Sequence, residues 1–235
     1  MEPSSSMSIS GNNFVFEPIP SATTVDGPYD FKVLFAGSMA VGKTSILRCL
    51  NNLPFNLHYK STVCYDSLWF DGNIPDIGNC PVCVYDMAGQ LRYASDAGSE
   101  DSMSENNGAQ NLPLLFREAS LLVCVFDIQQ SQTFRDLRFW INQFKNTSVF
   151  EELPPVLIVI NKLDMVDMSQ EELQEYTDNC MDEYESAACI GVSARSGYNI
   201  DELRKLIVNN LHERFGRPTE ATVTDLDEED IGCSC

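Results

Sequence analysis

The chain is poor in basic side chains. Its 235 residues include 15 Lys and Arg against 35 Asp and Glu, which gives a formal net charge of −20. Proteins that bind nucleic acid without regard to sequence neutralise its phosphates with Lys and Arg, so this composition argues against nucleic acid as a partner. The same charge argues against simple electrostatic docking on anionic lipid.

Long apolar runs and a cysteine framework are missing as well. The sequence has no run of the roughly 20 apolar residues that a membrane helix needs. Residues 1–13 have neither the basic region nor the apolar core of a secretion signal. The nine cysteines are odd in number and follow no regular spacing, which favours reduced thiols in the cytosol over disulfides. We therefore expect a protein that neither spans a membrane nor is secreted by a cleaved signal.

Short apolar runs alternate with stretches of helical periodicity. The predicted strands are 31–36, 63–70, 82–85, 121–126, 156–160 and 187–192, with Asp71-Gly72 in the connection between the second and third. The predicted helices are 44–53 (ended by Pro54), 134–144, 169–180 (opened by a Ser169/Glu172 capping box) and 200–211. This alternation predicts an α/β fold with a mostly parallel, six-stranded sheet and helices on both faces.

Composition divides the chain further. Residues 30–216 are expected to form the domain, and the polar residues 1–29 a flexible arm. Residues 94–112 have four carboxylates and no Lys or Arg, and residues 217–235 are acidic too, so both are expected to be solvated extensions.

The segment from Gly37 to Thr44 matches the phosphate-binding pattern G-x-x-x-x-G-K-[ST] and lies between a predicted strand and a predicted helix. In such a loop, backbone N–H groups and the positive end of the helix converge on an anion. Lys43 can reach the β- and γ-phosphates, and the Thr44 hydroxyl can bind Mg²⁺. The expected phosphate-binding residues of this loop are Gly37, Ala40, Val41, Gly42, Lys43, Thr44 and Ser45.

Two further motifs follow later strands, and the ends of parallel strands are where ligands bind in such sheets. In Asn161-Lys162-Leu163-Asp164, the carboxylate can accept from N1 and the exocyclic amine of guanine, whereas adenine offers no matching pair of donors. Ser193-Ala194-Arg195 ends the next strand and can approach the same base. A phosphate-binding loop alone does not distinguish ATP from GTP, so guanine specificity depends on these two segments.

A third motif, Asp86-Met87-Ala88-Gly89-Gln90, suits hydrolysis. Asp86 is placed to contact Mg²⁺ through water, Gly89 can turn its N–H towards the γ-phosphate, and Gln90 can orient the attacking water. Thr62 is a candidate second hydroxyl ligand of Mg²⁺, although a Thr that opens a strand is usually structural. The predicted catalytic residues are Gln90 and Lys43.

The ordered set GSMAVGKT, F-x-x-x-Y-x-x-T, DMAGQ, NKLD and SAR resembles the Ras superfamily of small GTPases over about residues 30–215. Phe126-Asp127-Ile128, Thr133-Phe134 and Trp140 resemble the Rab family in particular. The terminal Cys233-Ser234-Cys235 resembles the C-x-C ending on which Rab proteins carry two geranylgeranyl groups.

The resemblance implies further site roles. Phe55 should pack on guanine, Asn161 should buttress the loops, Lys162 should lie along the base, and the N–H of Ala194 should meet its oxygen. It also implies a protein that cycles between cytosol and the cytoplasmic face of intracellular membranes to regulate vesicle traffic. Its partners would be an exchange factor, an activating protein, effectors and a prenyl-dependent escort protein.

The sequence departs from the family pattern at several positions. Met39 replaces a small residue of the phosphate loop, Tyr85 a Trp, Cys64 a Gly and Arg195 a Lys, and residues 94–112 interrupt the switch II region. Two functions therefore stay open: a slow GTPase, which Gln90 favours, and a GTP-bound scaffold with little hydrolysis, which Met39 and the insertion favour. A P-loop nucleoside kinase would leave NKLD and SAR without roles.

Overall fold

A computed structural model describes residues 31–58, 61–62, 65–74, 78–90 and 112–215. The predicted arm (1–29), the acidic tail (217–235) with Cys233 and Cys235, and the acidic segment 94–112 apart from Leu112 lie outside these ranges. Cys64 lies outside them too.

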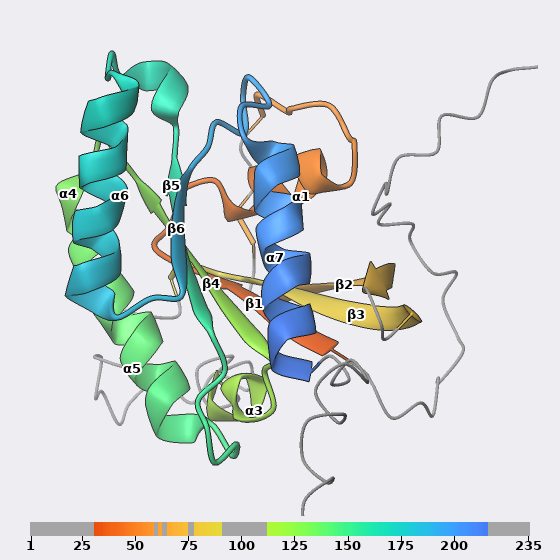
Figure 1. Ribbon diagram of the computed structural model, residues 1–235. Helices are drawn as coiled ribbons and strands as arrows, with labels where there is room; N and C mark the ends of the chain where they lie inside the picture. The colour runs from red at the N-terminus through yellow and green to blue at the C-terminus, as the bar shows by residue number, and fades with distance from the viewer. Residues whose placement is uncertain (1–30, 59–60, 63–64, 75–77, 91–111, 216–235) are drawn as a thin grey trace, which may run out of the picture.

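Six strands form one sheet in the order β2-β3-β1-β4-β5-β6 (Figure 1). They are β1 (Phe31–Ala36), β2 (Tyr65–Ile74), β3 (Gly78–Met87), β4 (Leu121–Asp127), β5 (Val156–Asn161) and β6 (Ala188–Gly191). Only the β2–β3 pair is antiparallel among the strand pairs of the described chain. The predicted fold class, a mostly parallel six-stranded α/β sheet, is confirmed.

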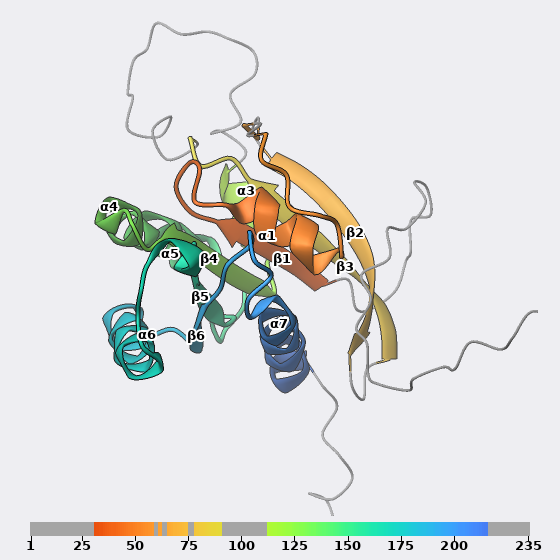
Figure 2. The ribbon, with the colours of Figure 1, turned by 90° about the horizontal axis from the view of Figure 1, so that it is seen from above.

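The helices are distributed over both faces of the sheet (Figures 1 and 2). They are α1 (Lys43–Leu50), α3 (Leu112–Arg117), α4 (Ser131–Arg135), α5 (Leu137–Thr147), α6 (Gln170–Tyr184) and α7 (Ile200–Phe215). One buried cluster joins α1 and α7 to the sheet, and a second joins α3, α5 and α6 to the opposite face. Strands β1, β4 and β5 contribute alternate side chains to the two clusters, as expected for strands covered on both sides.

Several predicted boundaries need correction. The first helix ends at Leu50, before Pro54, because Asn52 adopts a left-handed conformation (φ 57°), which Asn tolerates better than most residues. Asp71-Gly72 is not a turn: both residues lie in β2, paired with Pro81 and Cys80 of β3. The long predicted helix 134–144 is instead two helices that meet at Asp136.

The predicted start of the helix α6 is confirmed, and two other elements differ from the prediction. Ser169 and Glu172 form the predicted capping box, with each side chain accepting a hydrogen bond from the other residue's backbone N–H. The last strand is shorter than predicted, and α3 was not predicted, because its six residues are too few to show a helical period. Within the described ranges, every helix is too short or too polar to cross a membrane.

Candidate functional site

A cavity of about 510 Å³ opens at the carboxyl ends of the parallel strands. The segments after β1, β3, β5 and β6 line it, together with residues from the stretch between α1 and β2. Fourteen of the predicted site residues line this cavity: Ala40, Gly42, Lys43, Thr44, Ser45, Phe55, Thr62, Gly89, Gln90, Asn161, Lys162, Asp164, Ala194 and Arg195. Gly37, Val41, Asp86 and Ser193 lie behind this lining and contact it through the bonds described below.

The loop between β1 and α1 wraps around the side chain of its own lysine. Lys43 is buried, and its Nζ donates to the carbonyl oxygens of Gly37 and Ser38, at 2.9 Å each. Burial lowers the pKa of Lys43 to about 8, and the nearby carboxylate of Asp86 opposes that shift. A desolvated ammonium at the floor of a cavity is a site where an anion binds favourably.

Gly42 closes this loop, and the site has no room for a larger residue there. Its φ of 100° disfavours an L side chain, and a Cβ would lie 2.2 Å from Nδ2 of Asn161. The amide of Asn161 can therefore pack directly on the loop backbone.

Two hydroxyls and a carboxylate meet beside Lys43. Thr44 Oγ1 donates to Asp86 Oδ2 at 2.5 Å, and Thr62 Oγ1 lies 3.3 Å from Thr44 Oγ1 and 3.4 Å from Asp86 Oδ2. Burial raises the pKa of Asp86, partly offset by the bond from Thr44. Nothing in the described part of the chain donates to Asp86 Oδ1, although that atom is buried. One carboxylate with two hydroxyls suits Mg²⁺, which uses few protein ligands and completes its shell with water and phosphate oxygens.

The segment after β3 is pressed against the phosphate loop. A Cβ added to Gly89 would lie 2.2 Å from the backbone nitrogen of Met39, so only glycine allows this approach. Gln90 is exposed beside it, and Met39, which is 53% exposed, lines the same part of the cavity.

Asn161 ties two loops together. Its side-chain Nδ2 donates to the carbonyl oxygen of Val41 at 2.8 Å, and its Oδ1 accepts from the backbone N–H of Ala194 at 3.1 Å. Asn161 is only 2% exposed, so both bonds form away from solvent. The phosphate loop and the segment after β6 are thereby fixed to the end of β5.

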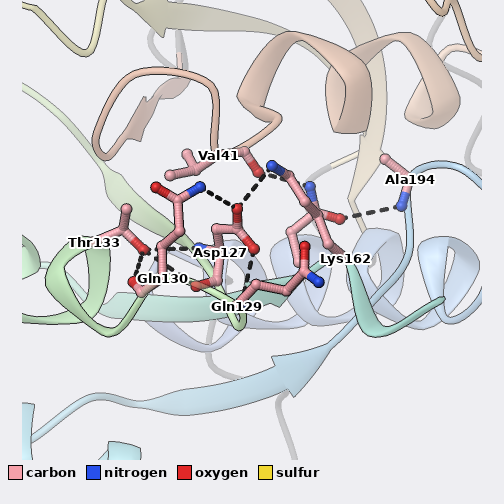
Figure 3. Close-up of polar contacts among 8 residues, drawn as sticks. Val41, Asp127, Gln129, Gln130, Thr133, Lys162 and Ala194 are labelled. Atoms are coloured by element: carbon pink, nitrogen blue, oxygen red, sulfur yellow. Dashed lines mark hydrogen bonds and ion pairs between the residues drawn. The ribbon is translucent and has the colours of Figure 1, made fainter. Parts of the chain in front are cut away.

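Lys162 adopts a left-handed conformation (φ 69°) and extends towards β4. Its Nζ donates to Asp127 Oδ2 at 2.8 Å. Figure 3 shows the Asp127 carboxylate between Lys162 and Gln130, whose Nε2 donates to Oδ2 at 2.7 Å. The backbone N–H of Gln129 donates to the other oxygen at 3.0 Å.

Asp164 faces the segment after β6. Its Oδ1 accepts from Ser193 Oγ at 2.6 Å, and its Oδ2 lies 3.9 Å from Arg195 Nη1. Phe55 also lines the cavity, is 36% exposed and presents an aromatic surface that a flat base can contact.

Sequence reasoning missed three parts of this site. Asp127 was named only as part of a family segment, although it directly follows an apolar strand, which is the signal that marked the Asn161–Asp164 segment. Gln129, in the turn after β4, lines the cavity. Ser38 and Asp136 are hydrogen-bonded across 98 residues, a contact that no local pattern encodes.

Comparisons with known proteins agree with this geometry. The family model "Ras family" matches residues 32–213. The Ras-related protein Rab-32D of Dictyostelium discoideum is 32% identical over 178 residues, which cover 73% of this chain and 69% of that protein. Rab-27B of Rattus norvegicus is 26% identical over 84% of this chain and 87% of its own length. Rab-7L1 of Homo sapiens is 27% identical over 87% of this chain and 96% of its own length. The chain therefore belongs to the Ras family and is a divergent, Rab-like small GTPase.

Proposed function

We propose that this protein is a switch between GTP and GDP forms that binds GTP with Mg²⁺, hydrolyses it slowly and regulates vesicle traffic. Family membership supports GTP binding, GTPase activity and a trafficking role in general terms. The observation that carries the proposal is the convergence of a lysine-centred phosphate loop with the Asp164 carboxylate in one cavity.

Guanine is held, in this proposal, between the segments after β5 and β6. Asp164 accepts from N1 and the exocyclic amine, while Phe55 and the stem of Lys162 contact the ring. The Asp127–Lys162 ion pair supports this, because it fixes the direction of the lysine stem. The N–H of Ala194, which donates to Asn161 Oδ1 at 3.1 Å in the structure, is shared in this proposal between that oxygen and the guanine oxygen, and Arg195 covers the rim.

The triphosphate lies along the loop from Gly37 to Ser45. Loop amides and Lys43 contact the β- and γ-phosphates. Thr44 and Thr62 hold Mg²⁺ directly and Asp86 through water. The metal, when bound, neutralises charge on the phosphate oxygens. Gly89 points its N–H at the γ-phosphate, and the segments around Thr62 and Gly89 respond to its loss.

Hydrolysis depends on positioning and electrostatics, with no covalent step on the protein. Gln90 orients the attacking water, and Lys43 and the loop amides stabilise charge on the transferring phosphoryl group. Because this leaves the intrinsic rate low, an activating protein supplies the remaining acceleration. The release of GDP requires an exchange factor, and effectors recognise the GTP form.

Met39 favours a second candidate, a GTP-bound scaffold with little hydrolysis. Its side chain lines the cavity beside Gln90, where it occupies space that water and a partner's side chain need. Single-turnover hydrolysis of GTP, followed by phosphate release, separates the two candidates. A slow GTPase converts all bound GTP within hours and loses this activity in Gln90→Leu, whereas a scaffold shows the same negligible rate in both proteins. Failure to prefer GTP over ATP in a binding assay would refute both.

Residues outside the described ranges complete the proposal. Residues 1–29 are an N-terminal extension, 94–112 an acidic insertion of the switch II region, and 217–235 an acidic C-terminal extension. Cys233 and Cys235 each carry a geranylgeranyl group, delivered with an escort protein, and anchor the protein to the cytoplasmic face of intracellular membranes. One lipid chain gives reversible binding and two give stable anchoring. Fractionation of cells expressing the Cys233→Ser/Cys235→Ser protein tests this, since that protein should be cytosolic and still bind GTP. Its retention on membranes would refute the lipid anchor.

A further inference from the structure

A buried polar contact from the junction of α4 and α5, away from the residues that line the cavity, reaches the phosphate loop. Ser38, the second residue of that loop, donates from Oγ to Asp136 Oδ2 at 2.7 Å. Ser38 is 6% exposed and Asp136 2% exposed, so water hardly competes for this bond. A hydroxyl that donates to a carboxylate is about twice as strong a hydrogen bond as one between neutral groups. The contact therefore restrains the loop firmly at a residue that does not line the cavity.

Asp136 is also held in place by hydrogen bonds to residues other than Ser38. It is the single residue between α4 and α5, and its backbone N–H donates to the carbonyl oxygen of Gln132 at 2.9 Å. The side chain of Gln132 donates to Asp136 Oδ1 at 2.6 Å, and Arg135 in turn donates to Gln132 Oε1 at 2.9 and 3.1 Å. The carboxylate thus connects the loop to the junction of α4 and α5.

Ser38 occupies a critical place in the loop. Its carbonyl oxygen accepts from Lys43 Nζ at 2.9 Å, so the same residue that Asp136 holds also orients the phosphate-binding ammonium. A Cβ on Gly89 would lie 2.4 Å from the carbonyl carbon of Ser38, which shows how tightly the two backbones are packed. A shift of the Ser38–Met39 peptide would therefore displace the groups that meet the β- and γ-phosphates together.

Electrostatics excludes a direct binding role for Asp136. Its carboxylate would repel a triphosphate, and it is absent from the residues that line the cavity. Asp136 can therefore affect nucleotide binding only through the position that it gives to the Ser38–Met39 peptide. A displacement of about 1 Å is enough to cost roughly a hundredfold in rate at a preorganised site.

We propose that Asp136 is a positioning residue for the phosphate loop. Through the hydroxyl of Ser38 it holds the Ser38–Met39 peptide where Lys43 and Gly89 can contact the triphosphate. The inference deepens the proposed function and rests on it, since the ligand is a guanine nucleotide with Mg²⁺.

The test compares Ser38→Ala, Asp136→Ala, Asp136→Asn and the double variant Ser38→Ala/Asp136→Ala with the wild-type protein. The readouts are the dissociation rate of fluorescent GDP with Mg²⁺, single-turnover GTP hydrolysis and the melting temperature. Loss of a buried charge-assisted bond should speed GDP dissociation by roughly ten- to a hundredfold in Ser38→Ala. Asp136→Asn keeps an oxygen acceptor and should stay within about threefold of wild type. The double variant should be no worse than Asp136→Ala alone, because Asp136→Ala already removes the bond from Ser38.

The matched control is Thr177→Ala. Thr177 is also buried, and its hydroxyl donates to the Gln174 carbonyl within α6, away from the loop. It should lower the melting temperature and leave GDP dissociation within twofold of wild type. If Ser38→Ala changes dissociation and hydrolysis no more than Thr177→Ala does, or if the two Ala substitutions are simply additive, the proposal is overturned. If Asp136→Ala fails to fold, the rates of GDP dissociation and GTP hydrolysis in Ser38→Ala and Asp136→Asn decide whether the proposal holds. A wild-type protein that does not retain GDP would instead refute the proposed function.

Discussion

Replacement of Asp164 by Asn should convert guanine preference into xanthine preference. The substitution keeps the size of the side chain and one of its acceptors. In the structure, the carboxylate is oriented by Ser193 Oγ at 2.6 Å and by Arg195 at 3.9 Å. With these partners in place, an Asn side chain should adopt nearly the same position. The change is then confined to the chemistry of the two atoms that face the base.

The magnitude follows from those two atoms. One hydrogen bond to a charged acceptor is lost, at about 1.5–3 kcal/mol, and the amide NH₂ of Asn then faces the exocyclic amine of guanine, which leaves donors unpaired at about 1–3 kcal/mol. The sum, roughly 3–6 kcal/mol, corresponds to about 10²- to 10⁴-fold weaker GTP binding. Xanthine has a carbonyl oxygen where guanine has this amine, so Asn can donate to it and the loss is largely restored.

Competition of GTP, XTP and ATP against a fluorescent nucleotide measures the effect. Asp167→Asn is the matched control, because it makes the same charge change at an exposed residue of the same segment that does not line the cavity. It should bind GTP as the wild-type protein does. Unchanged GTP affinity in Asp164→Asn, or equal weakening of GTP and XTP, would show that this carboxylate does not recognise the base.

Three other substitutions test neighbouring parts of the structure. Asn161→Ala leaves two buried backbone partners unpaired and should lower the free energy of unfolding by about 2–4 kcal/mol, measured by urea denaturation; a loss below 1 kcal/mol would contradict its role as a tie between loops. Met39→Gly clears space beside Gln90 and should raise single-turnover GTP hydrolysis roughly tenfold, whereas an unchanged rate would remove Met39 as the obstacle. Ser169→Ala removes the N-cap of α6 and should destabilise the domain by about 1 kcal/mol. Bonds from the backbone and side chain of Ser169 lower the pKa of Glu172, so this stabilisation is present above the ordinary value of 4.5 and is lost as the pH falls through the lowered pKa. The Ser169→Ala protein keeps the backbone N–H, which is the larger cause of the lowered pKa, and loses only the side-chain bond, so its stability should still fall over that acidic range but by less than in wild type.

The sheet was readable from the sequence because its strands are apolar throughout. β4 and β5 are buried at every residue. A short run of apolar residues such as Val156–Ile160 therefore predicts a buried strand directly. The boundaries at Asn52 and at Asp71-Gly72 were not readable. Asn and Gly each tolerate several conformations, and for Asp71-Gly72 the pairing of β2 with β3 decides which of them is adopted.

Most of the site was predictable for a related reason. Its residues follow strands that lie side by side, so a motif placed after each strand is brought to one edge of the sheet. Asp136 was not predictable, because it follows no strand and its partner Ser38 is 98 residues away. The break between α4 and α5 that positions it is invisible in the apolar spacing, which runs through the break without interruption.

The ties made by Asn161 have a consequence for nucleotide selection. The register of the sheet places Asn161 beside Asp127 and at the end of the strand that pairs with β6. From there its one amide contacts the phosphate loop at Val41 and the base-binding segment at Ala194. A base that does not fit between Asp164 and Ala194 must displace that segment, and the displacement strains a bond that also holds the phosphate loop. Discrimination between bases should therefore appear mainly in how fast the whole nucleotide leaves, because recognition of the base and retention of the phosphates share one buried side chain.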